Sequence, residues 1–153
     1  MKDKADEYAV IMEKYAAYVA KEKPCLDTPS TVASLMRPLL RDREQEEMHV
    51  LLLDSKNRMI ASERVTVGLV DRSQAHAREV FRAAIRRNCS KVILIHNHPS
   101  GDPAPSEKDI ACTRSLVEAG RVVGIEVLDH IVLGQRTENR PVDYLSMRER
   151  QFM

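Results

Sequence analysis

The chain has 153 residues, of which 43% are hydrophobic and 31% charged, and it contains no tryptophan. Its 24 basic and 23 acidic residues leave a net charge of +1, which does not indicate a general electrostatic binder of nucleic acid. Three widely spaced cysteines predict neither a disulfide framework nor a cysteine-based zinc knuckle. The start of the chain has no apolar signal region, and no run approaches the roughly 20 apolar residues of a membrane span. We therefore expect a globular protein of the reducing cytoplasm that does not enter a membrane.

Two helical patterns precede the first predicted strand. Apolar residues at helical spacing predict a helix over residues 4–22, which Pro24 ends. Thr28 has the side chain of an N-cap and Pro29 suits the first helical position, so a second helix is expected to begin there. Pro38 inside this second helix predicts a kink or an early break. The predicted buried face consists of Val32, Leu35, Met36, Leu39 and Leu40.

A β-hairpin follows a charged link over residues 41–47. The apolar run 48–53 predicts a buried strand, and residues 59–67 predict its partner. Residues 54–57 have the composition of a tight turn, which joins the two strands.

A third helix is predicted to begin at Ser73 or Gln74 and to end at Asn88. Its predicted inward face consists of Val80, Phe81, Ala84 and Ile85. Its outward face consists of Arg78, Arg82, Arg86 and Arg87. These arginines could contact phosphate, but Glu79 interrupts them, and a solvated helix face is the commoner explanation for such a pattern.

The second half of the chain continues to alternate strands and helices. Residues 92–95 predict a central strand, and a loop rich in proline and glycine leads from it to a helix over residues 106–119, with Gly120 as its C-terminal stop. Two further strand pieces are expected at 122–128 and 130–134, bent or interrupted at Asp129.

This order of elements predicts an α/β fold with a single mixed β-sheet packed with helices, because strands alternate with crossover helices. A short strand or turn is expected in the tail, residues 144–149. We expect an N-terminal helical extension over residues 1–29 and one domain over residues 30–153.

A candidate metal site lies at the end of the central strand. Residues i and i+2 of an extended segment point the same way, so His96 and His98 can present two imidazoles to one point. Asp109, in the first turn of the following helix, is a suitable third ligand, and three prolines in the loop 99–105 limit the entropy lost in bringing it there. Catalytic zinc takes three such ligands and keeps a fourth position for water, which indicates a zinc hydrolase.

Ser106 is placed to donate a hydrogen bond to an oxyanion, while a general base must come from elsewhere in the chain. Taken alone, Ser106 and Asp109 indicate an N-cap followed by an acid that favours the helix dipole. Together with the two histidines, they favour the metal site.

The pattern His96-x-His98-Pro99 followed by Ser106-x-x-Asp109 resembles the JAMM (JAB/MPN-type) metalloprotease motif, and its longer form resembles the bacterial RadC branch of that superfamily. The resemblance covers roughly residues 30–150. Matches outside the loop are Glu46 before Val50-Leu51-Leu52-Leu53-Asp54, Arg78-Glu79-Val80-Phe81-Arg82-x-Ala84, Gly124-Ile125, Leu128-Asp129-His130-Ile131 and Ser146-Met147-Arg148-Glu149. Longer RadC proteins carry an N-terminal helix-hairpin-helix, where this sequence has only the short helical region before residue 30.

The resemblance implies a JAB/MPN-like fold and a zinc site of His96, His98 and Asp109, with Ser106 assisting the oxyanion. It also implies a catalytic glutamate, which aligns with Glu46, and a slip of one residue would make it Glu47 instead. Neighbours on a strand face opposite ways, so only one of the two can face the metal.

We therefore expect a zinc-dependent hydrolase of peptide or isopeptide bonds with a protein or peptide substrate. The alternatives are a DNA-repair-associated or DNA-binding accessory protein, and a catalytically silent scaffold of the same fold. For His130 the sequence predicts either a position behind a metal ligand or, more simply, a buried hydrogen-bonded position. It predicts a turn role for Asp102 and a core position for Cys112. It indicates no role for His49 or His76, and no oligomeric state.

Overall fold

A computed structural model describes residues 23–68 and 75–153. The helix predicted over residues 4–22 and the helix start predicted at Ser73 or Gln74 lie outside the described residues, and the domain boundary at residue 30 stays a prediction. The elements are α2 (Pro29–Leu40), β1 (Glu47–Leu53), β2 (Met59–Val67), α3 (Ala77–Arg86), β3 (Lys91–Asn97), α4 (Glu107–Val123), β4 (Glu126–Leu133) and β5 (Tyr144–Ser146).

The strands form one five-stranded sheet in the order β2-β1-β3-β4-β5. Only β3 and β4 are parallel, because α4 crosses over between them, while the other neighbouring pairs are antiparallel. The predicted α/β fold with a single mixed sheet is therefore confirmed. The described residues include no helix that is long and apolar enough to cross a membrane.

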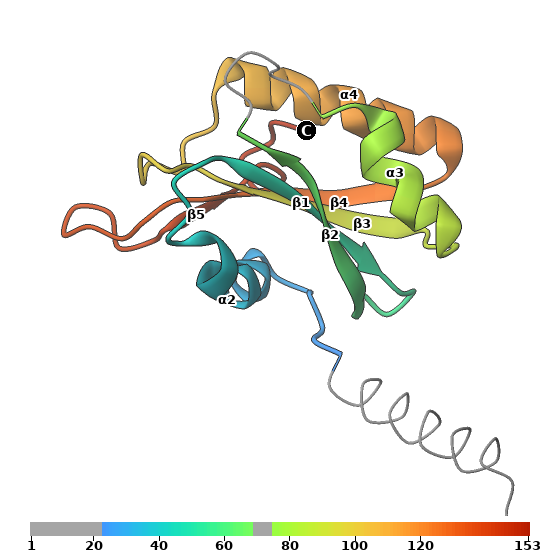
Figure 1. Ribbon diagram of the computed structural model, residues 1–153, viewed down its shortest axis with the longest axis horizontal. Coiled ribbons are helices and arrows are strands. Elements are labelled where there is room, and N and C mark those ends of the chain that lie inside the picture. The colour runs from blue at the N-terminus through green and yellow to red at the C-terminus, as the bar shows by residue number, and fades with distance from the viewer. Residues whose placement is uncertain (1–22, 69–74) are drawn as a thin grey trace, which may run out of the picture.

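Helices cover both faces of the sheet, with α3 and α4 on one side and α2 on the other (Figure 1). The alternation along β1 separates two cores. Val50 and Leu52 join the core under α3 and α4, whereas Leu51 and Leu53 join the core under α2. A strand that is buried on both faces reads as an unbroken apolar run, which is why residues 48–53 are so hydrophobic.

The start of α2 matches its prediction. Thr28 accepts a hydrogen bond from the Thr31 N–H at 3.2 Å in a capping box, and Pro29 occupies the first turn. Three of the predicted inward residues, Val32, Met36 and Leu40, are buried, and Leu35 is partly buried. Leu39 was predicted to be inward but is 42% exposed. The buried arc of α2 includes Ala33, so its centre is shifted away from Leu39, which lies at its edge. The helix passes through Pro38 and ends two residues later.

The buried face of α3 consists of Val80, Phe81, Ala83 and Ala84. Ile85 was predicted to be inward and is 60% exposed. At about 100° per residue, Ile85 lies about 120° around the helix from the centre of that buried face, so the correction follows from helix geometry once Ala83 is known to be inside.

The end of α4 corrects the prediction that Gly120 stops the helix. The helix continues to Val123 and ends at Gly124, which adopts the left-handed conformation with a φ of 76°. Gly120 is instead buried inside the helix, and a Cβ there would collide with the carbonyl oxygen of Ile125. Val122 and Val123, predicted to be in a strand, are exposed helical residues.

The strand pieces predicted on either side of Asp129 form the single strand β4. The register shifts where Val92 faces Val127 and Ile93 faces Asp129, so Leu128 is the extra residue of a bulge. The interruption predicted from the sequence is therefore a local irregularity within a continuous strand.

An alanine at Gly120 tests whether close packing, and not helix termination, selects glycine there. Helix propensity alone predicts that Gly120→Ala stabilises the protein by about 1 kcal/mol. We expect the opposite sign, a loss of about 1–3 kcal/mol in the free energy of unfolding, because the added methyl group has no space. Urea denaturation followed by circular dichroism measures it, with Ser115→Ala on the exposed face of α4 as control. A gain in stability for Gly120→Ala would contradict the packing explanation.

A bidentate ion pair joins α2 to the segment before β5. Arg37 Nε lies 2.6 Å from Asp143 Oδ2, and Arg37 Nη2 lies 2.8 Å from Asp143 Oδ1. Asp143 is 3% exposed, so few water molecules screen the pair. The hydrogen bonds from Arg37 lower the pKa of the Asp143 carboxyl below its ordinary value.

This pair predicts an acid-sensitive contribution to stability. Because the pKa of Asp143 is lower in the folded chain, the contribution is complete above the unfolded value of about 4 and declines as the pH falls through the folded value. We expect Asp143→Asn to lower the free energy of unfolding by about 1–3 kcal/mol at pH 7, a difference that narrows at about pH 3. Urea titrations at pH 7 and at about pH 3 measure the loss in the free energy of unfolding and its decrease in acid. Asp42→Asn, which alters an exposed pair, should change neither.

Candidate metal centre

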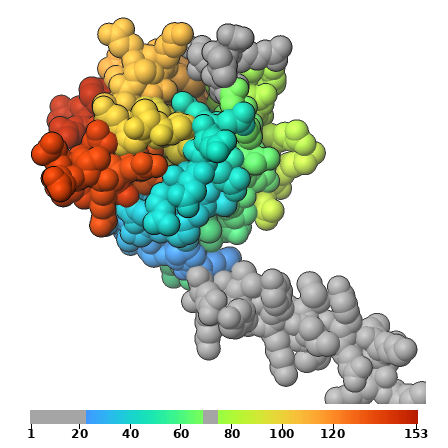
Figure 2. Space-filling model, turned by 60° about the vertical axis from the view of Figure 1, so that its left-hand side comes forward, coloured from blue at the N-terminus to red at the C-terminus, as the bar shows by residue number. Residues whose placement is uncertain are grey.

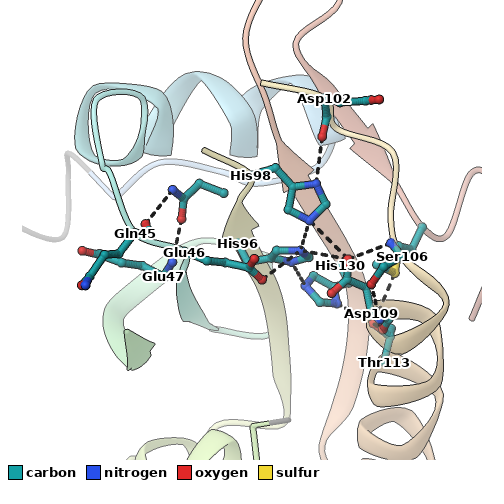
Figure 3. A network of polar contacts seen from close by, with 12 residues as sticks. Gln45, Glu46, Glu47, His96, His98, Asp102, Ser106, Asp109, Thr113 and His130 are labelled. Atoms are coloured by element: carbon teal, nitrogen blue, oxygen red, sulfur yellow. Dashed lines mark hydrogen bonds and ion pairs between the residues drawn. The ribbon is translucent and has the colours of Figure 1, made fainter. Parts of the chain in front are cut away.

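The candidate site forms where β3 ends, β1 begins and α4 starts (Figure 3). His96 Nε2 lies 3.0 Å from His98 Nε2, and Asp109 Oδ2 lies 3.2 Å from His98 Nε2 and 3.6 Å from His96 Nε2. With Glu46, these residues form a group whose ligand atoms all lie within 4.8 Å of one another. His96 is 1% exposed, so the site has a buried wall on the side of the sheet.

A buried chain of hydrogen bonds fixes the tautomer of His96. Thr113 Oγ1 lies 2.7 Å from the carbonyl oxygen of Asp109 and 3.2 Å from Met147 Sδ, which are both acceptors. With its one proton directed to these acceptors, the hydroxyl oxygen accepts from His130 Nδ1 at 2.6 Å. The Nε2 atom of neutral His130 therefore carries a lone pair and accepts from His96 Nδ1 at 2.7 Å. In a neutral His96 ring, the remaining Nε2 lone pair points into the site.

Burial keeps His130 in the neutral state that this series of hydrogen bonds requires. The ring is fully buried, and desolvation, with the positive potential of His96 in addition, lowers the pKa of His130 well below its ordinary value. His130 is thus the buried, hydrogen-bonded histidine predicted from the sequence, and it also lies directly behind His96.

His98 is oriented in the same way by the backbone. Its Nδ1 lies 2.8 Å from the carbonyl oxygen of Asp102, which can only accept, so Nδ1 is the donor and a neutral ring leaves Nε2 bare. Two bare Nε2 atoms 3.0 Å apart repel each other unless a cation lies between them. Their separations from each other and from Asp109 bracket the edge of about 3.3 Å expected for N and O ligands of a tetrahedral metal. The residues present therefore fit a metal ion.

The electrostatics of the site also favour positive charge. Partial burial acts to raise the pKa of the Asp109 carboxyl, but the hydrogen bonds that the His96 and His98 rings donate to it when they are protonated outweigh burial and hold that pKa well below the ordinary value. For His98, burial acts to lower the pKa, and the bonds to Asp109 and to the Asp102 carbonyl outweigh it and raise that pKa. The carboxylate is thus ionised in a position where it attracts a cation.

Ser106 and Asp109 hold the start of α4 together. Ser106 Oγ accepts from the Asp109 N–H at 3.1 Å, and Asp109 Oδ2 accepts from the Ser106 N–H at 2.8 Å, which is a reciprocal capping box. The capping interpretation and the ligand interpretation of this pair are compatible, because Asp109 Oδ2 faces both the helix end and the histidines. Within the described residues, the Ser106 hydroxyl proton is not engaged in a hydrogen bond.

The two glutamates at the start of β1 point to opposite faces of the sheet. Glu46 lies on the side of His96, with Oε1 3.8 Å from His96 Nε2, and its side chain is 46% exposed. Glu47 is 4% exposed on the other side, where its Oε2 lies 3.0 Å from His49 Nε2. The structure therefore brings Glu46, and not Glu47, to the histidines, while the role of Glu46 as a base stays a prediction.

Two residues around the site were not predicted from the sequence. Thr113 lies one helical turn after Asp109, so the i, i+4 spacing on α4 could have indicated it. Asn97 lies between the two histidines and contacts the backbone on either side of Glu46, which no local pattern reveals.

The other predicted positions have simple structural roles. Asp102 caps its own turn by accepting from the Ala104 N–H at 3.0 Å, as its loop composition predicts. Cys112 is buried in the core, also as predicted, and His76 is the N-cap residue of α3. The three arginines of α3 and Arg87, its C-cap residue, are exposed, and a nucleic-acid role for them stays a prediction.

Comparison with known proteins places the chain in a family. A model of the RadC-like JAB domain matches residues 26–152. The chain belongs to this family. It is similar to UPF0758 proteins from Desulforamulus reducens, with 45% identity over 121 residues, and from Symbiobacterium thermophilum, with 50% identity over 128 residues. A third, from Methanosarcina mazei, is 37% identical over 155 aligned positions.

These alignments cover 79%, 84% and 99% of the chain, respectively. The chain spans 53%, 52% and 65% of the corresponding relatives, that is, between half and two thirds of their length. The family supports the RadC resemblance inferred from the sequence motif.

The hydrogen-bond chain behind His96 predicts a loss of metal affinity without Thr113. Thr113→Val keeps the shape of the side chain but removes the hydroxyl, so the His130 ring loses the group that fixes its tautomer. We expect metal affinity to fall by about 10- to 100-fold, as when other groups that orient a metal ligand through a hydrogen bond are removed. Competition with a chromophoric chelator measures it, with Thr66→Val on β2 as the matched control. Equal metal affinity in the two variants would show that the hydrogen bonds from Thr113 through His130 do not orient His96.

Proposed function

We propose that this protein is a zinc-dependent hydrolase of amide bonds, acting on a peptide or isopeptide link in a protein or peptide substrate. The single observation that carries the proposal is the convergence of two bare imidazole nitrogens and an ionised carboxylate, 3.0–3.6 Å apart, beside a second carboxylate. A structural zinc site is closed by four protein ligands, whereas a hydrolase keeps one position open. The RadC-like JAB family membership supports this class of site.

His96, His98 and Asp109 would hold the zinc ion. A zinc ion in such a site supplies Lewis acidity and lowers the pKa of water to about 7. Nitrogen and carboxylate ligands suit zinc. Among the described residues, no cysteine belongs to the group of candidate ligands, which argues against a soft-metal centre.

Glu46 is suited to move the proton. Its carboxylate lies beyond the three closer ligand atoms, 3.8 Å from His96 Nε2, and its half-exposed side chain can reach an incoming substrate. In the proposed reaction, it accepts a proton from the attacking water and later delivers that proton to the leaving amine. If Glu46 were a fourth ligand instead, the site would be closed and the hydrolase proposal would fail.

Ser106 is suited to stabilise the oxyanion. Its Oγ accepts the Asp109 N–H, which orients the hydroxyl at the edge of the site. The proton that remains is available for donation to the developing negative charge on a carbonyl oxygen. A helix start places this donor with little freedom to move.

The surface around the site is assembled from distant parts of the chain. The segment near residue 45 borders the loop near residue 100, and the segment that follows β4 adjoins the same loop (Figure 2). Gln135 Nε2 donates to the carbonyl oxygen of Arg41 at 3.4 Å, which links two of these segments.

Substitution of the two glutamates separates metal binding from catalysis. We expect Glu46→Gln to bind zinc with wild-type stoichiometry and to lose at least about 100-fold in turnover, because a positioned general base contributes 10²- to 10⁴-fold. Glu47→Gln, on the opposite face, should retain turnover within a few-fold. Zinc content measured by mass spectrometry and hydrolysis of a panel of fluorogenic peptides, including lysine-linked isopeptides, report the two effects.

Two results would contradict the proposal. Wild-type protein that takes up no zinc on titration would remove the metal site, and zinc loss in Glu46→Gln would make Glu46 a ligand and close the site. His98→Ala serves as the positive control for loss of metal, because it removes one of the two converging nitrogens.

A further inference from the structure

The position of Glu46 is set by its backbone, because its side chain forms no hydrogen bond within the described residues. Its carboxylate lies 3.8 Å from His96 Nε2. Two neighbouring strands could fix this backbone, β2 on one side and β3 on the other. The two sides do so in different ways.

On the side of β2, an ordinary backbone bond holds Glu46. The Gly68 N–H donates to the Glu46 carbonyl oxygen at 2.8 Å, one residue beyond the last pair of the β1–β2 ladder, Glu47 with Val67. Gly68 has a φ of 63°, a conformation that glycine adopts without strain.

On the side of β3, the backbone ladder stops before it reaches Glu46. The last β1–β3 pair is Met48 with His96, and the next residues, Glu47 and Asn97, are not paired through their main chains. The Asn97 side chain fills this gap. Its Oδ1 accepts from the Glu47 N–H at 2.7 Å, and its Nδ2 donates to the Gln45 carbonyl oxygen at 3.0 Å.

We propose that Asn97 is a positioning residue that holds Glu46 at the metal site by bonding the backbone on both of its sides. The proposal rests on the function proposed above and assigns a role to the residue between the two histidine ligands. Asn97 is 3% exposed, so both bonds are shielded from water. Its amide orientation follows from its partners, because an N–H must meet the oxygen and a carbonyl must meet the nitrogen.

The geometry explains why this residue sits between two ligands. His96 lies on the face of the sheet that carries α4, and Asn97, the next residue of β3, points to the opposite face. The same short segment of β3 therefore directs a ligand toward the metal and ties down the strand that carries the base. The Asn97 amide thus bonds the Gln45 carbonyl and the Glu47 N–H. Figure 3 shows the side chain of Glu46, the residue between these two, directed toward His96.

Cobalt-substituted protein tests this role without a known substrate. The visible absorption spectrum of bound Co²⁺ responds to groups around the metal, so Glu46→Gln defines the spectrum without the carboxylate. We expect Asn97→Ala to change the spectrum in the same direction, and the double variant to match Glu46→Gln alone. Co²⁺ affinity in Asn97→Ala should stay within about three-fold of wild type, because all three ligands remain.

Asp54→Ala is the matched control. Asp54 Oδ1 accepts from the Lys56 and Arg58 N–H groups at the other end of β1, so its loss weakens the same strand away from the metal. We expect this variant to keep the wild-type spectrum. If Asn97→Ala does not fold, Asn97→Ser replaces it, because the shorter side chain cannot span Gln45 and Glu47.

Turnover gives a second reading. On the fluorogenic peptides described above, Asn97→Ala should lower kcat by about 10- to 100-fold and leave KM unchanged. A wild-type spectrum in Asn97→Ala, or a double variant whose spectral change is the sum of both single changes, would overturn the positioning role. Failure of the proposed function itself is distinct, because it would appear as absence of metal uptake or of hydrolysis in the wild-type protein.

Discussion

The local structure of this protein is organised around the close approach of two imidazole nitrogens. His96 Nε2 and His98 Nε2 are 3.0 Å apart, and the protons that could separate them are committed to the Nδ1 atoms. Such an arrangement is favourable only when positive charge lies between the rings, and the ionised Asp109 carboxylate adds to that demand. These residues therefore fit a cation, and the rest of the fold supplies the rigidity that keeps them in place.

That rigidity comes from the position of β3 in the sheet. It lies between β1 and β4, with β1 delivering Glu46 and β4 delivering His130 behind His96. The crossover helix α4 that joins β3 to β4 also carries Asp109 and Thr113, one turn apart. One parallel pair and its crossover thus bring a ligand, its supporting ring and the hydroxyl that orients that ring into contact. The two helix-covered faces keep this assembly dry on the inner side.

Local patterns predicted the elements well where one physical signal dominated. The start of α2 follows from Thr28 and Pro29, and the strand at residues 48–53 follows from an apolar run covered on both faces. They failed where two explanations for one residue compete. Gly120 resembles a helix stop, yet it is glycine because the Ile125 carbonyl leaves no space for a side chain, while Gly124 ends the helix. Ile85 and Leu39 have the hydrophobicity of core residues but lie off the buried arc of their helices.

The sequence by itself determined which groups can bind a metal. Two histidines at strand spacing, followed by a serine and an aspartate at capping spacing, encode their local geometry within a few residues. Only the tertiary structure decided between Glu46 and Glu47, because that choice depends on the register of β1 against β3, in which Met48 pairs with His96, 48 positions later in the chain. The contacts of Asn97 and the chain from His96 through His130 to Thr113 were decided in the same way, since each bond joins elements that only the folded sheet brings together.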